Sequence, residues 1–234
     1  MIRPLIIALD VENRQNMQEL LKTLPKPLFV KVGMELFYSE GPAVIEQLKD
    51  EGHQVFLDLK LHDIPNTVKR AMRQLATLGV DIVNVHVAGG VNMMAAAREG
   101  LEAGTVDGRN RPKLIGVTQL TSTNEAMLQK ELLIQSNMNG AVSHYARLAK
   151  EAGLDGVVSS AQEVPIIHEH CGPSFLTVTP GIRLKEDDKG DQTRIVTPEE
   201  ARTLGSWAIV VGRSITAAPD PAAAYEIIRK QWEG

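Results

Sequence analysis

Short apolar segments recur along the chain, and each is followed by a stretch in which apolar and polar residues are mixed. The segments are continuous rather than alternating and rich in β-branched residues, a pattern typical of strands buried on both faces of a parallel sheet. The sequence predicts eight such strands, over residues 5–9, 28–32, 55–59, 82–85, 114–117, 156–158, 175–178 and 208–211.

The stretches between these segments place apolar residues at the spacing of one helix face. Examples of this spacing are Met17, Leu20, Leu21 and Leu24; Val44, Ile45 and Leu48; Val68, Met72 and Leu75; and Ala141, Tyr145 and Leu148. Capping residues stand where helices are expected to begin, and glycines where they are expected to end. The expected caps are Asn13, Asn124 and Thr197, and the expected terminal glycines are Gly52, Gly79 and Gly153.

Eight alternations of strand and helix favour an α/β fold, a closed (β/α)8 TIM barrel forming a single domain over residues 1–234. The main alternative is an open doubly wound sheet, which usually has fewer strands and a glycine-rich turn after the first one. The expected first turn, Leu9–Asn13, contains no glycine. The longest polar stretch, Gly181–Thr193, is expected to be a loop after the seventh strand.

Composition limits the classes of partner. The net charge is −4 and aromatic residues make up 4% of the chain. These values argue against a nucleic-acid partner, which requires a basic surface and rings for stacking. A small anionic substrate would have to be bound by a local cluster of donors rather than by overall charge.

Cys171 is the single cysteine, so an internal disulfide is excluded and a reducing compartment is expected. We interpret Cys171 as structural, with a catalytic thiol as the alternative. The first ten residues lack the apolar core of a signal peptide, and no later run is long enough to span a membrane. We therefore expect a cytoplasmic protein without a membrane partner.

Charged residues cluster at the predicted strand ends, where the active site of a barrel lies. Asp10 follows the first strand, Lys31 lies on the second, and Asp58 and Lys60 close the third. Because side chains alternate along a strand, Asp58 and Lys60 should face the barrel mouth while Leu59 faces the helices. Buried charges persist when they are paired, so we predict an array of ion pairs rather than a solvated loop.

A phosphate site is expected at the loops after the seventh and eighth strands. Gly212 would let backbone N–H groups approach an anion closely, and Arg213 would add a bidentate donor. Arg183 and Gln192 flank the polar segment Leu184–Asp191, whose composition suits a mobile lid.

The run Phe56–Thr67, FLDLKLHDIPNT, resembles the D-x-K-x-x-D-I-P-x-T motif of the orotidine 5'-phosphate decarboxylase family. Further segments match that family in order along almost the whole chain. They are Ala8–Asp10, Val30–Gly33, Leu120–Ser122, Thr179–Arg183, Asp191–Arg194 and Val211–Ile215.

The resemblance implies decarboxylation of orotidine 5'-monophosphate to uridine 5'-monophosphate and CO2, the last step of de novo UMP synthesis, without cofactor or metal. Lys60 would protonate C6 of the pyrimidine, and Asp58 would lie against the substrate carboxylate. Asp63 would complete the array from the partner subunit of a homodimer, together with Ile64 and Thr67.

The resemblance also assigns the remaining substrate-binding positions. Lys31 would bind both the ribose and the charged array, and Asp10 would bind the ribose. Thr121 would lie near the pyrimidine, and Pro180 is a further substrate-binding position. The phosphate would be held by Arg183, Gln192, Gly212 and Arg213.

Three rivals remain open. A Mg²⁺-dependent relative, 3-keto-gulonate-phosphate decarboxylase or hexulose-phosphate synthase, resembles this chain in the third strand, but there an acidic metal ligand is expected where Lys31 stands. An aldose-phosphate epimerase or an indole-pathway barrel would share the phosphate end without needing Asp58 and Lys60. A non-catalytic nucleotide-binding barrel would be expected to have lost a member of the array.

The histidines and methionines have simpler interpretations. His86 could be a catalytic base, but packing beneath the site explains it better, and we interpret His62 as structural. The other histidines show no metal-site spacing, so no metal is assigned. The residues Met93, Met94, Met127 and Met138 are expected to pack on helix faces.

Overall fold

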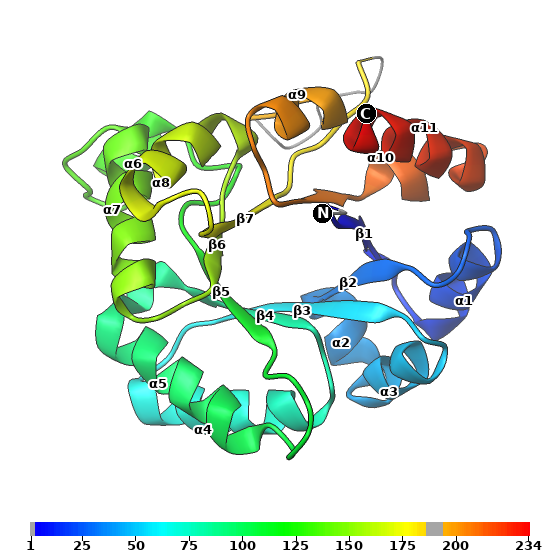
Figure 1. The fold of residues 1–234 in the computed structure, drawn as a ribbon, viewed down its shortest axis with the longest axis horizontal. Coiled ribbons are helices and arrows are strands. Elements are labelled where there is room, and N and C mark those ends of the chain that lie inside the picture. The colour runs from blue at the N-terminus through cyan, green and yellow to red at the C-terminus, as the bar shows by residue number, and fades with distance from the viewer. Residues whose placement is uncertain (1–2, 186–193) are drawn as a thin grey trace.

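A computed structural model describes residues 3–185 and 194–234 of the chain. Eight parallel strands close into a barrel in chain order, with β8 hydrogen-bonded to β1. Figure 1 shows the helices arranged around the outside of this ring. The prediction of a (β/α)8 barrel is therefore confirmed. The strands are β1 (Leu5–Ala8), β2 (Phe29–Gly33), β3 (Gln54–Leu61), β4 (Ile82–His86), β5 (Lys113–Val117), β6 (Gly156–Val158), β7 (Leu176–Thr179) and β8 (Ala208–Val211).

Helices follow the strands and cover the outer face of the barrel. The α-helices are α1 (Arg14–Lys22), α2 (Met34–Glu40), α3 (Ala43–Asp50), α4 (Pro65–Thr77), α5 (Gly90–Gly104), α6 (Glu125–Lys130), α7 (Met138–Glu151), α8 (Val164–Cys171), α9 (Pro198–Thr203), α10 (Arg213–Thr216) and α11 (Pro221–Glu233). Two short 3-10 helices are η1 (Val87–Gly89) and η2 (Ala161–Glu163).

The helix caps predicted from the sequence are present. Asn13 and Asn124 accept hydrogen bonds from the first turns of α1 and α6, and Thr197 forms a capping box at the start of α9. Gly52 and Gly79 have φ values of +83° and +69°, a backbone region that glycine adopts without steric cost. These residues fix where each helix ends and the next strand begins.

Two apolar layers result from the alternation of side chains along the strands. Ile6 and Ala8 belong to a cluster that fills the barrel, whereas Ile7 and Leu9 belong to the larger cluster between strands and helices. Phe56 belongs to the inner cluster. The next inward positions toward the carboxyl ends of β1 and β3 are polar, so the barrel core ends where a polar site begins. Within the described residues, no helix is both long and apolar enough to cross a membrane.

Candidate active site

Two cavities open at opposite ends of the barrel. The larger, about 1360 Å³, is lined by first residues of several strands, including Leu5, Phe29 and Gln54. The smaller, about 440 Å³, is lined by residues at or after the carboxyl ends of the strands. Size alone would favour the first cavity, so the chemistry of the side chains has to decide.

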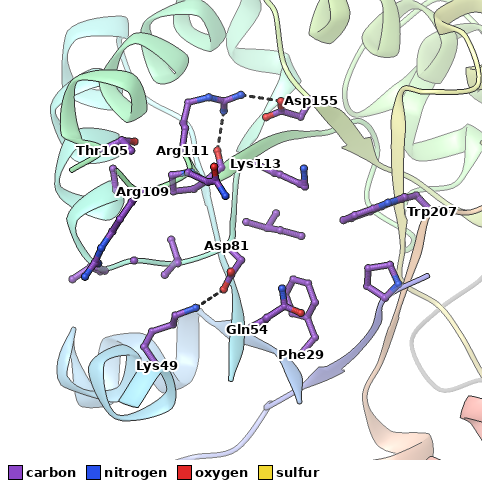
Figure 2. Close-up of a pocket in the computed structure, with 18 of the residues that line it drawn as sticks. Phe29, Lys49, Gln54, Asp81, Thr105, Arg109, Arg111, Lys113, Asp155 and Trp207 are labelled. Atoms are coloured by element: carbon purple, nitrogen blue, oxygen red, sulfur yellow. Dashed lines mark hydrogen bonds and ion pairs between the residues drawn. The ribbon is translucent and has the colours of Figure 1, made fainter. Parts of the chain in front are cut away.

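Figure 2 shows two ion pairs among the side chains that line the larger cavity, from Lys49 to Asp81 and from Arg111 to Asp155. Asp81, just before β4, accepts hydrogen bonds from the Lys49 ammonium and the Val55 N–H, both at 2.7 Å. Asp155, just before β6, accepts in the same way from Arg111 at 2.8 Å and from the Leu114 N–H at 2.7 Å. In each case an aspartate that precedes one strand binds the start of the neighbouring strand. We call these two aspartate contacts strand clamps, and they give the four charged side chains a structural role.

The smaller cavity gathers most of the residues predicted from the sequence. Those that line it are Asp10, Lys31, Asp58, Lys60, Thr121, Pro180, Arg183, Gly212 and Arg213. They come from the ends of β1, β2, β3, β7 and β8 and from the loop after β5. The cavity at the carboxyl ends of the strands is therefore our candidate active site.

The charged residues form a continuous array across β1, β2 and β3. The Lys60 ammonium lies 2.7 Å from Asp58 Oδ1, and the Lys31 ammonium lies 3.6 Å from Asp58 Oδ2. Lys31 also lies 2.9 Å from Asp10 Oδ1. Each carboxylate in the array is thus matched by an ammonium group, as the sequence predicted.

Asp58 is buried, with 8% of its surface exposed, and it is held in the charged form. Burial by itself would raise the pKa of Asp58. The ammonium groups of Lys31 and Lys60, together with hydrogen bonds from Lys60 and Asn84, outweigh burial and hold the pKa of that carboxyl below its usual value. The site therefore keeps a carboxylate facing the cavity at neutral pH.

The backbone of β3 departs from the regular alternation that the sequence suggested. Both Asp58 and Lys60 line the cavity, and Leu59 packs in the outer cluster. Lys60, however, has a φ of +50°, and the pairing of β3 with β4 shifts register between Leu57 and Leu61. The expected facing is thus correct, but it is produced by a bulge and not by a regular strand.

The residues expected to serve a partner lie outside the cavity of their own chain. Asp63, Ile64 and Thr67 are exposed at the start of α4 and do not line it. The Asp63 carboxylate accepts a hydrogen bond from the neighbouring Ile64 N–H at 2.6 Å. Their predicted role therefore depends on a second subunit.

At the end of the cavity where the sequence predicts a phosphate site, Gly212 precedes the short helix α10, which Arg213 begins. Arg183 is buried, and its guanidinium donates to the Ile182 carbonyl at 2.9 Å. Ile182 forms a bridge with Val196, which joins the two sides of the expected lid segment. Gln192 and most of the lid Leu184–Asp191 lie outside the described residues.

Sequence reasoning missed three polar residues at the site. Gln119 and Ser159 line the cavity from the ends of β5 and β6. Asn84 on β4 is buried and donates to Asp58 Oδ1 at 2.6 Å. A signal was present, since Asn84 interrupts the apolar run of β4 at the same parity as the inward Ile82.

The remaining candidate residues do not line the cavity. The His86 ring lies 5.8 Å from that of His62, and burial lowers the pKa of His86. Cys171 is buried at the end of α8, and burial raises the pKa of its thiol, which opposes a nucleophilic role. Met93 and Met94 are buried on α5. Among the described residues, no group of three or more His, Cys, Asp or Glu side chains is arranged to hold a metal ion.

Comparison with known proteins gives one consistent family. The model of the Orotidine 5'-phosphate decarboxylase / HUMPS family matches residues 3–228. An orotidine 5'-phosphate decarboxylase of Geobacillus sp. (strain WCH70) is 61% identical over 232 residues, covering 99% of this chain and 97% of the relative. One from Bacillus cereus (strain AH187) is 60% identical over 235 residues, covering 100% and 99% respectively.

Solved structures show the same barrel. The crystal structure of orotidine 5'-phosphate decarboxylase from Lactobacillus acidophilus superposes with a TM-score of 0.90 at 46% identity, covering 100% of both chains. An uncharacterized conserved protein from Geobacillus kaustophilus superposes with a TM-score of 0.87 at 55% identity, covering 98% of this chain and 100% of that one.

Proposed function

Because this chain belongs to the Orotidine 5'-phosphate decarboxylase / HUMPS family, we propose that it converts orotidine 5'-monophosphate to uridine 5'-monophosphate and CO2 without a cofactor or metal. The observation that carries this proposal is the array Lys31–Asp58–Lys60 in the cavity at the carboxyl ends of the strands. The reaction would be the last step of de novo UMP synthesis.

Lys60 is the proton donor in this proposal. When the bond from C6 to the carboxylate breaks, its electron pair stays on C6 in the ring plane, where the π system cannot delocalise it. The Lys60 ammonium stabilises this carbanion by its charge and then gives it a proton. At an effective dielectric constant of about 20, opposite charges about 4 Å apart gain roughly 4 kcal/mol, so one contact supplies only part of the rate enhancement.

Asp58 and Lys31 form the charged surroundings of this ammonium group. Asp58 pairs with the Lys60 ammonium at 2.7 Å and would lie beside the departing carboxylate. Lys31 balances the charge of Asp58 and, with Asp10, would bind the ribose hydroxyls. Thr121 and Pro180 would border the nucleotide within the same cavity.

The phosphate would be bound at the other side of the cavity. Arg183, Gly212 and Arg213 line it there, and Gln192 is assigned to the same group. A bidentate arginine and open backbone N–H groups match the geometry of a phosphate. Binding of the phosphate away from the reacting carbon provides energy that can be used to exclude water from the ring.

We further propose that residues 1–234 form one decarboxylase domain that acts in the cytoplasm as a homodimer with shared active sites. Asp63, Ile64 and Thr67 would enter the partner's cavity. The exposure of Ile64, 68% in the single chain, supports burial against a second subunit. A Mg²⁺-dependent reaction is disfavoured because Lys31 has no oxygen ligand to offer at the position where that rival needs one.

The test is an ultraviolet assay of purified protein with orotidine 5'-monophosphate in excess EDTA. We expect turnover to persist under chelation. The Lys60→Ala variant should still bind uridine 5'-monophosphate but lose at least about 1,000-fold in kcat. Lys49→Ala is the matched control, because Lys49 also makes a 2.7 Å ion pair with an aspartate, at the opposite end of the barrel. Turnover that stops in EDTA and returns with Mg²⁺ would favour the metal-dependent rival.

A further inference from the structure

The bulge in β3 has a specific partner on β4. Leu57 pairs with Val83 and Leu61 pairs with Val85. The three residues from Asp58 to Lys60 therefore lie opposite a single residue, Asn84. Such a bulge leaves backbone groups without their ladder partners, and bulges are common next to active sites.

The Asn84 side chain supplies the missing contacts. Its amide Nδ2 donates to Asp58 Oδ1 at 2.6 Å. Its carbonyl Oδ1 accepts from the Lys60 backbone N–H at 2.8 Å. Asn84 is buried, with 2% of its surface exposed, so neither bond competes with bulk water. One side chain thus binds both the Asp58 carboxylate and the backbone of Lys60.

The backbone at Lys60 needs such a contact. Its φ of +50° lies in the left-handed region, which is strained for a residue with a Cβ and persists only when its surroundings enforce it. Within the described residues, the other non-glycine residue with a positive φ is Leu133. At Lys60 this conformation directs the ammonium to Asp58, 2.7 Å away.

We propose that Asn84 is the positioning residue of the active site, which fixes the left-handed Lys60 and the Asp58 carboxylate in their reactive geometry. This proposal rests on the proposed function. Asn84 does not line the cavity and acts through the two residues it binds. An aliphatic side chain at this position would leave the Lys60 N–H without its acceptor and would remove one of the two donors to Asp58 Oδ1.

The charged and titratable groups around this contact come from β2, β3 and β4 and from the residues after β1. Lys31 on β2 and Lys60 on β3 face Asp58, and Asp10 lies beyond Lys31. On β4 itself, His86 lies near Lys60 and Asp58 and contributes to the same electrostatic environment. These are the groups whose protonation a substitution at position 84 can affect.

The first experiment compares Asn84→Leu with the wild type in steady-state assays with orotidine 5'-monophosphate. A misplacement of about 1 Å can cost about 100-fold in rate, so we expect kcat to fall by about that factor. The dissociation constant for uridine 5'-monophosphate should stay within about threefold, because the phosphate and ribose contacts are intact. Thr177→Val is the matched control. Thr177 is a fully buried strand residue whose hydroxyl accepts from the Trp207 N–H, and its loss should lower Tm without changing kcat.

The second experiment uses Asn84→Asp, which keeps the shape and the acceptor for Lys60. Two carboxyls at this distance share one proton, and the protonated form can donate to Asp58 as the amide does. When the shared proton is lost at higher pH, the donor becomes a second negative charge. The pH profile of kcat should therefore descend at a lower pH in Asn84→Asp than in the wild type, an effect that a merely structural residue would not produce.

The outcomes separate two failures. If the wild type is active and Asn84→Leu retains kcat within about threefold, Asn84 does not position the site. An unchanged pH profile in Asn84→Asp would lead to the same conclusion, and it remains informative if the leucine variant does not fold. If the wild type itself does not decarboxylate orotidine 5'-monophosphate, the proposed function fails, and the role of Asn84 fails with it.

Discussion

Single residues at this site are placed by polar partners rather than by packing alone. Asp58 is buried yet charged, because two ammonium groups and one amide donor compensate the loss of water. Arg183 is likewise buried, with a backbone carbonyl as one of its partners. The sequence predicted Asp58 and Lys60, since charges in an apolar strand stand out. It did not single out Asn84, because a neutral amide in such a strand has many structural explanations.

At the residue scale, Arg213 allows a test of the phosphate assignment. Loss of one charge-assisted contact costs about 1.5–3 kcal/mol, so Arg213→Ala should lower kcat/KM for orotidine 5'-monophosphate by roughly tenfold to about 150-fold. The slow turnover of the nucleoside orotidine, which has no phosphate, should be unchanged. Steady-state assays with both substrates give the ratio. An equal loss for the two substrates would place Arg213 elsewhere in the mechanism.

At the scale of elements, the amino-terminal ends of several strands are joined by one repeated contact. A side chain that immediately precedes one strand accepts a hydrogen bond from a backbone N–H at the start of the previous strand in the chain. Asp81 and Asp155 do this for β3 and β5. His53 does the same for the residue that precedes β2, accepting from the Leu28 N–H at 3.0 Å. These contacts set the register of neighbouring strands far from the candidate active site.

The His53 contact makes stability depend on pH. Burial lowers the pKa of His53, and nearby Lys26 adds to the effect. Below the ordinary histidine pKa of about 6.5, the unfolded chain binds a proton that the folded protein excludes. The free energy of unfolding should therefore fall as pH decreases from about 6.5 toward the lower folded pKa, by at most about 1.4 kcal/mol per pH unit from this group.

Urea unfolding between about pH 5 and 8 checks this expectation. The His53→Gln variant keeps an acceptor but does not titrate, so its stability should change less over this range than that of the wild type. The matched control is His144→Gln, at an exposed position on α7. The same slope in the wild type and in His53→Gln would show that other groups cause the dependence.

The positions of the strands were predictable from the sequence, because they depend on a local pattern of apolar residues. The pairing register between neighbouring strands was not. The eight apolar runs lie within one or two residues of the observed strands, because a strand buried on both faces leaves a continuous apolar signature. The shift between β3 and β4 involves pairing across the sheet, which no pattern within one strand encodes. The simple alternation argument gave the right facing for Lys60 but not its backbone conformation.

At the scale of the whole molecule, the two ends of the barrel do different work. One end holds the charged array in a cavity of about 440 Å³, and the other holds the strand clamps around a larger cavity of about 1360 Å³. Barrel closure was predictable from the count of alternating elements. The proposed homodimer rests on the family resemblance instead, because the surface that would contact a partner carries no periodic signal.

The proposed homodimer can be tested by mixing two inactive variants. Lys60→Ala removes the proposed proton donor of its own site, and Asp63→Ala removes the group that would be supplied to the partner's site. After dissociation and reassociation of equal amounts, about half of the dimers should be mixed. Each mixed dimer would contain one site with both residues intact, so about a quarter of all sites should be restored. Activity measured before and after mixing gives the answer. No recovery would indicate that each chain builds a complete site alone.

Because of the bulge between Leu57 and Leu61, the site depends on the number of residues in β3 as well as on which residues they are. A shorter β3 that paired residue for residue with β4 would have a regular hydrogen-bond ladder, but Lys60 would no longer be directed into the cavity. Evolution can therefore exchange the outward Leu59 for another apolar residue more readily than it can insert or delete a residue here. Family members that share the chemistry should align through this segment without gaps, even where the surrounding helices differ in size.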